Sequence, residues 1–194
     1  MNEFITYLQL GFEHISDVNA YDHIVFIIAL TAVYRLNELK RIFWLVTSFT
    51  IGHSISLALA TLHIVIVPSE IIEFLIPVTI LITAILNVTR SVETTIEKKI
   101  KFSYVLAMGF GVIHGMGFSN YLQLLLGSET SILGPLLAFN IGLEVGQLMI
   151  VAIILLAMVI GEKILKIKYR DWVLFLSGAA AGIALILINE TKFW

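Results

Sequence analysis

Long apolar stretches alternate with short polar connections along almost the whole chain. A helix needs about 20 apolar residues to cross roughly 30 Å of hydrocarbon. Stretches of about this length fall at residues 20–36, 42–63, 69–89, 102–125, 131–161 and 172–190. The pattern therefore predicts an all-α polytopic membrane bundle of six transmembrane helices, and we expect the whole chain, 1–194, to form one integral membrane domain.

The first residues differ from these spans because they are too few and mix polar with apolar positions. Phe4, Leu8 and Phe12 recur at helical spacing and share one face. Such a pattern is typical of a helix that lies in the membrane interface. We therefore expect a short N-terminal interfacial helix ahead of the first span.

Composition excludes several classes of protein. Of the 194 residues, 59% are hydrophobic and only 13% are charged, whereas soluble domains have about 25% charged residues. The chain contains no cysteine, which excludes disulfides, zinc fingers and thiolate metal sites. The net charge of −2 gives no sign of nucleic-acid binding. We expect the protein to be surrounded by membrane lipid. The sequence is compatible with a homo-oligomer.

The distribution of basic residues predicts the orientation. All 12 Lys and Arg residues except Lys192 fall in the first, third and fifth connections between the predicted spans. Cytoplasmic connections are enriched in these residues. We expect those three connections in the cytoplasm, both termini on the extracytoplasmic side, and a multi-pass location in the cell (inner) membrane.

A cluster of ionisable residues stands at the outer mouth of the first span. The segment EHISDVNAYDH, residues 13–23, contains His14, Asp17, Asp22 and His23 and runs directly into an apolar stretch. Charged groups at such a position are costly unless something compensates them. This segment therefore indicates a cation site.

Three more ionisable residues lie inside later spans. At about 1.5 Å per helical residue, His53 and His114 lie at similar depth, and Glu144 lies somewhat deeper. We expect His23, His53 and His114 to approach within reach of one metal ion, with Glu144 compensating its charge. Four further polar residues are candidates for supporting roles or an inner exit: Ser54, Asn87, Asn140 and Gln147.

Simpler interpretations exist for each of these residues. Intramembrane histidines often serve as interhelical hydrogen-bond partners, and an aspartate or asparagine often marks a helix end. Glu70 and Glu73 read as interfacial residues. The metal hypothesis depends on the combination, since three histidines and a carboxylate at matched depth are hard to obtain by accident.

Imidazole and carboxylate suit a borderline divalent metal, and the lack of thiolates disfavours copper(I). A permease would hold such an ion weakly near the midplane. A hydrolase would hold zinc through three ligands and keep one position open for water. The residues themselves allow either function, and also a metal-binding accessory protein without transport.

Four ordered motifs carry a resemblance that covers roughly residues 10–190. HIxxxxxYDHIVF, FTxxHSxSLALA, FGxxHGxGF and FNxGxExGQ resemble the HupE/UreJ family of hydrogenase- and urease-associated membrane proteins. The resemblance implies secondary transport of nickel or cobalt. The donor chemistry also allows zinc, and we assign no catalytic residue, while an intramembrane metal-dependent hydrolase stays the alternative. Ala20 departs from the glycine expected before the aromatic-Asp-His motif. Carried over by position, the motif residues are His14, Asp22, His23, His53, Ser54, His114, Gly115, Asn140, Glu144 and Gln147.

Overall fold

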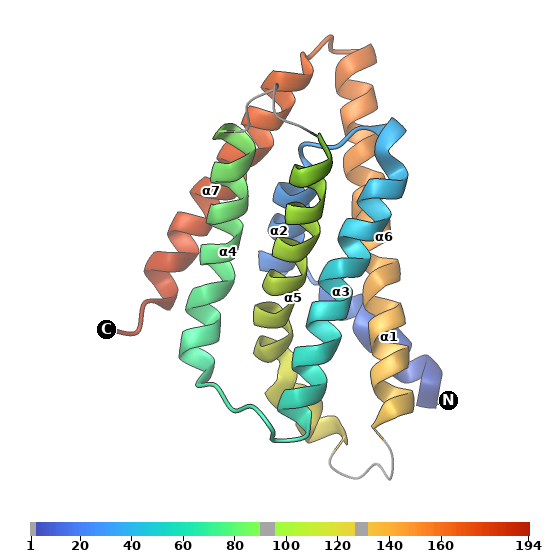
Figure 1. Ribbon diagram of the computed structural model, residues 1–194, viewed down its shortest axis with the longest axis vertical. Coiled ribbons are helices and arrows are strands. Elements are labelled where there is room, and N and C mark those ends of the chain that lie inside the picture. Colours follow the sequence, from blue (N-terminus) through green and yellow to red (C-terminus); the bar gives the residue numbers. More distant parts are fainter. Residues whose placement is uncertain (1–2, 90–95, 127–131) are drawn as a thin grey trace.

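The computed structural model describes residues 3–89, 96–126 and 132–194, and within these ranges all regular structure is helical. The helices are α1 (Glu3–Ser16), α2 (Asp22–Thr31), α3 (Leu39–Thr61), α4 (Ser69–Thr89), α5 (Ile96–Leu126), α6 (Leu133–Lys163) and α7 (Tyr169–Thr191), with a 3-10 turn at Leu36–Glu38 before α3. Figure 1 shows the long helices side by side, running alternately up and down.

Five of the described helices, α3 to α7, are long and apolar enough to cross a membrane. Their bounds follow the five later predicted spans closely, except that α5 begins earlier, at Ile96. This result confirms the all-helical fold of the described residues, and the five long apolar helices are compatible with a multi-pass membrane bundle. The residues 90–95 and 127–131, which include parts of the predicted third connection and of the loop before α6, lie outside the described residues.

The predicted first span differs from the structure. In place of one helix over 20–36, α2 covers only 10 residues, which is about 15 Å of rise and half of the hydrocarbon thickness. The chain breaks before it because the Asp17 carboxylate accepts a hydrogen bond from the Asn19 backbone N–H at 2.8 Å. Such a local bond favours a turn over a helix.

The N-terminal helix α1 packs against α6. In Figure 1, α1 begins at the lower right and packs along α6, while α2 continues upward in the centre of the bundle. A Cβ at Gly11 would overlap the Phe139 carbonyl, and one at Gly142 would overlap the Leu8 carbonyl. The two backbones therefore touch through glycine, as is typical of membrane helix pairs.

Glycines also allow a close backbone contact between α3 and α5. Gly111 faces the Phe49 carbonyl, and Gly115 faces the carbonyl of His53 and the hydroxyl of Ser56. No side chain larger than hydrogen fits at these two positions, so the backbones approach closely. This contact fixes the rotation of both helices and places His53 and His114 on the interior side, where each has 0% exposure.

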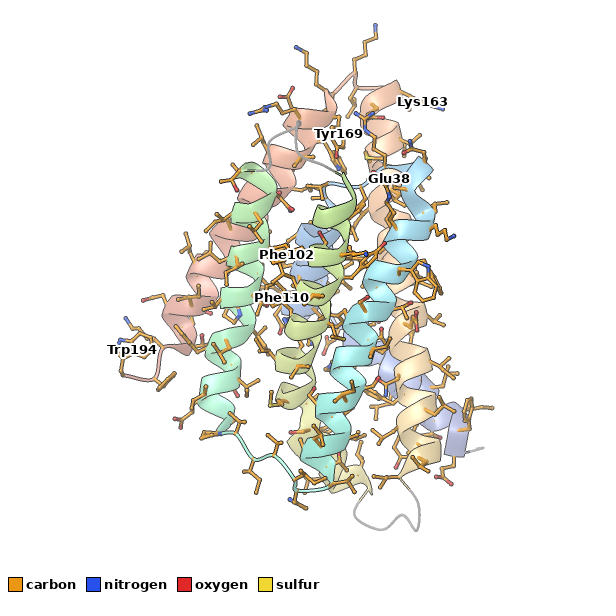
Figure 2. The ribbon with its side chains drawn as sticks, viewed as in Figure 1. Glu38, Phe102, Phe110, Lys163, Tyr169 and Trp194 are labelled. Atoms are coloured by element: carbon orange, nitrogen blue, oxygen red, sulfur yellow. The ribbon has the colours of Figure 1, made fainter. Side chains whose placement is uncertain are left out.

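The turn after α2 and the start of α7 meet at one end of the bundle. Lys163 and Tyr169 lie beside Glu38 at one end of the molecule, and Trp194 lies well below them (Figure 2). Tyr169 donates a hydrogen bond to the Val33 carbonyl at 2.6 Å, and the Arg35 guanidinium stacks 4.0 Å above the same ring. The turn after α2 is thereby tied to the start of α7.

Candidate metal site

The break between α1 and α2 gives the candidate site its geometry. His14 lies in the last turn of α1, and Asp22 and His23 begin α2, so the two short helices direct three potential ligands into one volume. From the opposite side, the α3–α5 pair contributes His53 and His114. Broken helices are a recurrent way to place ion ligands inside a membrane domain.

Two groups of potential ligands form there and share one residue. His14, His23 and His53 make the first group, and Asp22, His23 and His114 make the second. Within each group the ligand atoms lie within 4.8 Å of one another. Zinc binds imidazole nitrogen at about 2.0–2.1 Å, so small side-chain movements bring each group around a single first-row ion.

Ring distances describe the same cluster. The His23 ring centroid lies 4.6 Å from that of His14 and 5.1 Å from that of His114. The rings of His14 and His53 are 6.0 Å apart. His23 is therefore the centre of the cluster, with the other three histidines around it.

The hydrogen bond of His23 shows which nitrogen is free. Its Nδ1 lies 3.2 Å from the Asp22 Oδ1, and an ionised carboxylate can only accept. Nδ1 therefore carries the proton, and Nε2, which is buried without a partner, has the lone pair. A carboxylate that orients a metal-binding imidazole in this way is common around metal ions.

His114 is oriented by a threonine. The Thr79 hydroxyl donates its only proton to the Ile76 carbonyl at 2.7 Å. Its contact of 3.1 Å with His114 Nε2 must then be donated by the imidazole. The lone pair of His114 is consequently on Nδ1, which is buried and has no partner.

The unusual property of this cluster is that many of its imidazole nitrogens have no hydrogen-bond partner. In the described part of the chain, seven buried side-chain atoms have no hydrogen-bond partner, and five of them are imidazole nitrogens: His14 Nε2, His23 Nε2, His53 Nδ1 and Nε2, and His114 Nδ1. Buried polar atoms nearly always have a partner. Their concentration in one place calls for a ligand.

Four aromatic rings enclose the histidines. Phe118 lies 4.0 Å from the His14 ring centroid, Phe26 lies 4.8 Å from that of His114, and Phe49 lies 5.3 Å from it. Phe139 stacks on His53 at 6.1 Å with an interplanar angle of 17°. These walls exclude water, so any charge bound inside acts at a low local dielectric constant.

Comparison with known protein families identifies the family of this chain. A family model described as HupE / UreJ protein matches residues 1–190. The chain belongs to the HupE/UreJ family. The comparison with curated proteins and the comparison with solved structures each found no match.

The structure of this HupE/UreJ chain brings some of the predicted site residues together and not others. His14, Asp22, His23, His53 and His114 form the cluster. Asp17 is exposed in the turn between α1 and α2, where it binds Asn19. Ser54 donates to the Thr50 carbonyl of its own helix. Asn87 donates to the Ala29 carbonyl and to Ser177, which links α4 to α2 and α7.

Glu144 and Gln147 lie in a separate polar layer. Thr47 donates to the Glu144 carboxylate at 2.5 Å, and Thr50 donates to Gln147 Oε1 at 2.8 Å. We call these four residues the α3–α6 seam. Asn140, one turn before Glu144, lies close enough to His53 for a polar interaction, but the two side chains do not meet the geometry of a hydrogen bond, so Asn140 Oδ1 and both His53 nitrogens are left without a partner. The cluster and the seam are therefore adjacent but distinct.

Sequence reasoning missed Thr79 and the four phenylalanines. Thr79 has no signal of its own in an apolar span, and its role depends on how α4 faces α5. Phe49, Phe139 and Phe118 stand close to motif histidines or asparagine in the sequence. That proximity is the signal that could have identified them as walls of the site.

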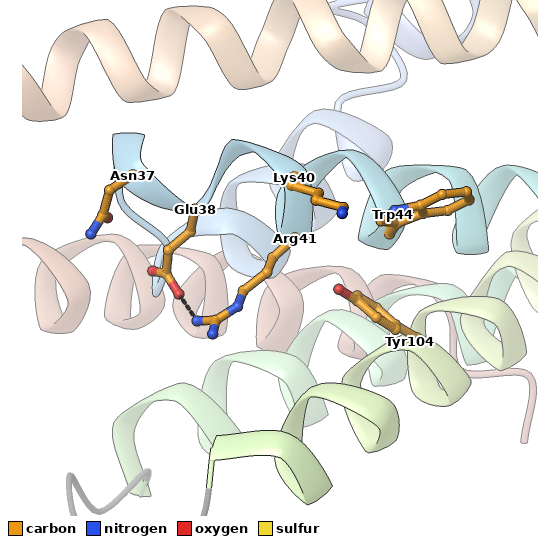
Figure 3. Close-up of a pocket in the computed structure, with 6 residues that line it drawn as sticks. All are labelled: Asn37, Glu38, Lys40, Arg41, Trp44 and Tyr104. Carbon is orange, nitrogen blue, oxygen red and sulfur yellow. Dashed lines mark hydrogen bonds and ion pairs between the residues drawn. The ribbon is translucent and has the colours of Figure 1, made fainter.

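A larger hollow lies elsewhere. A depression of about 470 Å³ at the start of α3 is lined by Glu38, Lys40, Arg41, Trp44 and Tyr104 (Figure 3). Arg41 is paired there with Glu38 at 2.5 Å. His53 follows Arg41 by 12 residues on the same helix, about 18 Å away along the axis, so this depression is separate from the histidine cluster.

Proposed function

We propose that this protein is a membrane permease for a divalent transition metal, nickel or cobalt, and that His14, His23, His53, His114 and Asp22 bind the ion in transit. The observation that supports the proposal most is the group of five buried imidazole nitrogens without partners. Histidines that served only to join helices would have their nitrogens paired with other helices.

The donor set suits these ions. Four imidazoles and one carboxylate provide nitrogen and oxygen ligands of intermediate hardness, which nickel, cobalt and zinc accept. Met116 is the sulfur nearest to His114 in the sequence, and the chain has no cysteine. Membership in the HupE/UreJ family favours nickel and cobalt over zinc.

The proposed topology has six crossings with both termini outside. The long helices α3 to α7 make five of them, and α1 with α2 makes the sixth as a discontinuous helix. Two observations support this arrangement. Helix α1 packs along α6, and α2 contacts α4, α7 and α6 inside the bundle. In the sequence, the basic residues of the described ranges other than Lys192 fall at or near the starts of α3, α5 and α7 or at the end of α6, and these helix ends lie at one end of the bundle (Figure 1). In the proposed topology that end faces the cytoplasm of a cell (inner) membrane.

The proposed inward path follows the α3–α6 seam. Thr47 precedes His53 by six residues, so the Thr47–Glu144 pair lies about 9 Å further toward the cytoplasmic end. Glu144 is the next carboxylate that an ion leaving the cluster would meet, and it balances the charge of the ion there. The amide nitrogen of Asn87 donates to two neighbouring helices, so we assign this residue a bridging role outside the proposed path.

A zinc-dependent intramembrane hydrolase is the second candidate. The group of His14, His23 and His53 resembles a catalytic arrangement with three protein ligands and one open position. In that case Asp22 or Glu144 would act as the general base. The bound metal would then remain in the protein and would not be moved across the membrane.

Uptake and binding, measured together, separate these functions. His53→Leu removes two candidate nitrogens and is expected to abolish both nickel content in the purified protein and accumulation of radioactive nickel in cells. Glu144→Gln is nearly isosteric and keeps an acceptor for Thr47. We expect it to abolish accumulation while folding and bound nickel are retained, and unchanged accumulation in this variant would contradict the transport mechanism.

A further inference from the structure

A cavity of about 170 Å³ opens beside the start of α2, between the beginning of α4 and the end of α7. Asn19, Ala20 and Asp22 form one wall, and Glu73 and Pro77 of α4 form another. Each water molecule occupies about 30 Å³ in the liquid, so the volume accommodates a cation with part of its hydration shell. The cavity lies apart from the depression at the start of α3.

Asp22 connects this cavity to the histidine cluster. Its side chain lines the cavity and is 24% exposed, while its Oδ1 lies 3.2 Å from the Nδ1 of the buried His23. His23 in turn presents an unpartnered Nε2 to the cluster. An ion that arrives at Asp22 has therefore reached a member of the second ligand group, and only His23 separates it from the first.

Glu73 gives the cavity a second negative group. Its carboxylate belongs to an exposed residue of the cavity wall. Four residues later, Pro77 lies inside α4 and lines the same cavity. Proline has no N–H, so the Glu73 carbonyl loses the helical hydrogen bond that it would otherwise accept. Glu73 thus brings a carboxylate to the cavity that Asp22 also lines, and its carbonyl oxygen has lost its helical donor.

We propose that this cavity is the entrance through which the metal ion reaches the histidine cluster, and that Glu73 is the residue that attracts it. The inference rests on the proposed function, because it supplies the route to that site. Oxygen groups at the entrance hold a partly hydrated ion, and the nitrogen groups inside replace its remaining water. Opposite charge at an entrance raises the association rate of a cation more than its final affinity.

A blocked entrance tests the route. The chain has no cysteine, so Ala20→Cys provides a unique thiol on the cavity wall. Val18→Cys is the matched control, because Val18 is 75% exposed in the same turn and does not line the cavity. After modification with a bulky thiol reagent and removal of metal, the Ala20→Cys protein should take up nickel about tenfold more slowly, because the attached group fills the cavity and a close-packed interior opens a new route only at a cost in packing. The modified Val18→Cys protein should load like wild type.

A charge change tests Glu73 itself. At low salt, Glu73→Gln should lower the initial rate of nickel loading several-fold and leave the nickel content at equilibrium unchanged, and high salt should remove the difference. Glu70→Gln makes the same change of charge one turn earlier on α4, at an exposed residue outside the cavity. That variant should load at the wild-type rate at either salt concentration.

The outcomes of these experiments distinguish a failure of the entrance proposal from a failure of the proposed function. If wild-type protein binds nickel but modified Ala20→Cys loads at full speed, the cavity is not the entrance, and the proposed function is unaffected. Equal rates for Glu73→Gln and Glu70→Gln would remove the role of Glu73. If wild-type protein binds no nickel, the proposed function fails first and the entrance fails with it.

Discussion

The histidine cluster and the α3–α6 seam are both polar regions within the helices, yet they differ in how their hydrogen bonds are satisfied. In the seam, Thr47 pairs with Glu144 and Thr50 pairs with Gln147. In the cluster, five buried imidazole nitrogens have no partner. The polar groups of the seam bind one another, whereas the cluster leaves nitrogen atoms available for the ion in the proposed function.

This difference predicts opposite responses to mutation. Removal of a partner from the seam leaves a buried polar group unsatisfied, which costs stability. Removal of an imidazole from the cluster breaks few bonds within the protein and removes a ligand atom. Variants of the cluster should therefore lose metal and keep their fold. Seam variants that remove a hydrogen-bond partner should keep metal and lose stability, whereas Glu144→Gln, which keeps an acceptor for Thr47, should not.

The largest expected effect is that of His23→Ala. His23 belongs to both ligand groups, so its loss should weaken nickel binding by about 100-fold or more, as the loss of a shared ligand exceeds that of an orienting residue. Titration of nickel into purified protein measures this change. His63→Ala is the matched control, because His63 belongs to neither group, and it should bind nickel like wild type. Equal affinities of the two variants would contradict the assignment.

Asp22→Asn should have the next largest effect. The neutral amide no longer holds the proton of His23 on Nδ1, and loss of such an orienting carboxylate typically lowers metal affinity by about 10- to 100-fold. The same titration measures the change. If Asp22→Asn binds nickel as tightly as wild type, Asp22 neither ligates the ion nor orients His23.

Thr50→Val should break the seam and leave the cluster intact. Gln147 is 1% exposed, so loss of its donor should lower the free energy of unfolding by about 1–3 kcal/mol. Thr31→Val is the control, since the buried Thr31 hydroxyl donates only to the Ile27 carbonyl within its own helix. Thermal unfolding in detergent compares the two proteins. An equal loss of stability in both would show that the seam has no special role.

His53→Leu should have the smallest effect on stability. Both of its ring nitrogens lack partners and the side chain has 0% exposure, so an apolar replacement of similar size should change the free energy of unfolding by less than about 1.5 kcal/mol. Thermal unfolding without metal gives this value. A large loss of stability would indicate a partner for His53 within the protein.

Much of the fold follows from the sequence, because apolar stretches in a membrane protein can form little besides helices. The stretches 69–89 and 172–190 contain helices with nearly the expected bounds. The expectation was wrong for the first span, where a single helix over 20–36 is absent. Local hydrogen bonds of Asp17 and the packing of α1 on α6 decide that region, and hydrophobicity alone reports neither.

The candidate site could be predicted in part for a similar reason. Spacing along a helix gives the depth of a residue, which is how His53 and His114 could be matched. Rotation about the helix axis depends on packing, here on Gly111 and Gly115. Rotation also separates Glu144 from the histidines and joins it to Thr47. Its proposed role in the inward path stays a prediction.

The most direct test of the central claim is X-ray absorption spectroscopy at the nickel edge of wild-type protein loaded with one equivalent of nickel. The account predicts a shell of nitrogen and oxygen ligands near 2.0–2.1 Å, by analogy with zinc–imidazole bonds of about that length, with multiple scattering from at least three imidazole rings and no sulfur. The imidazole signal should be absent from His23→Ala protein at the same nickel concentration. A shell of water and carboxylate oxygen alone in the wild-type protein would contradict the assignment of the histidine cluster as a metal site.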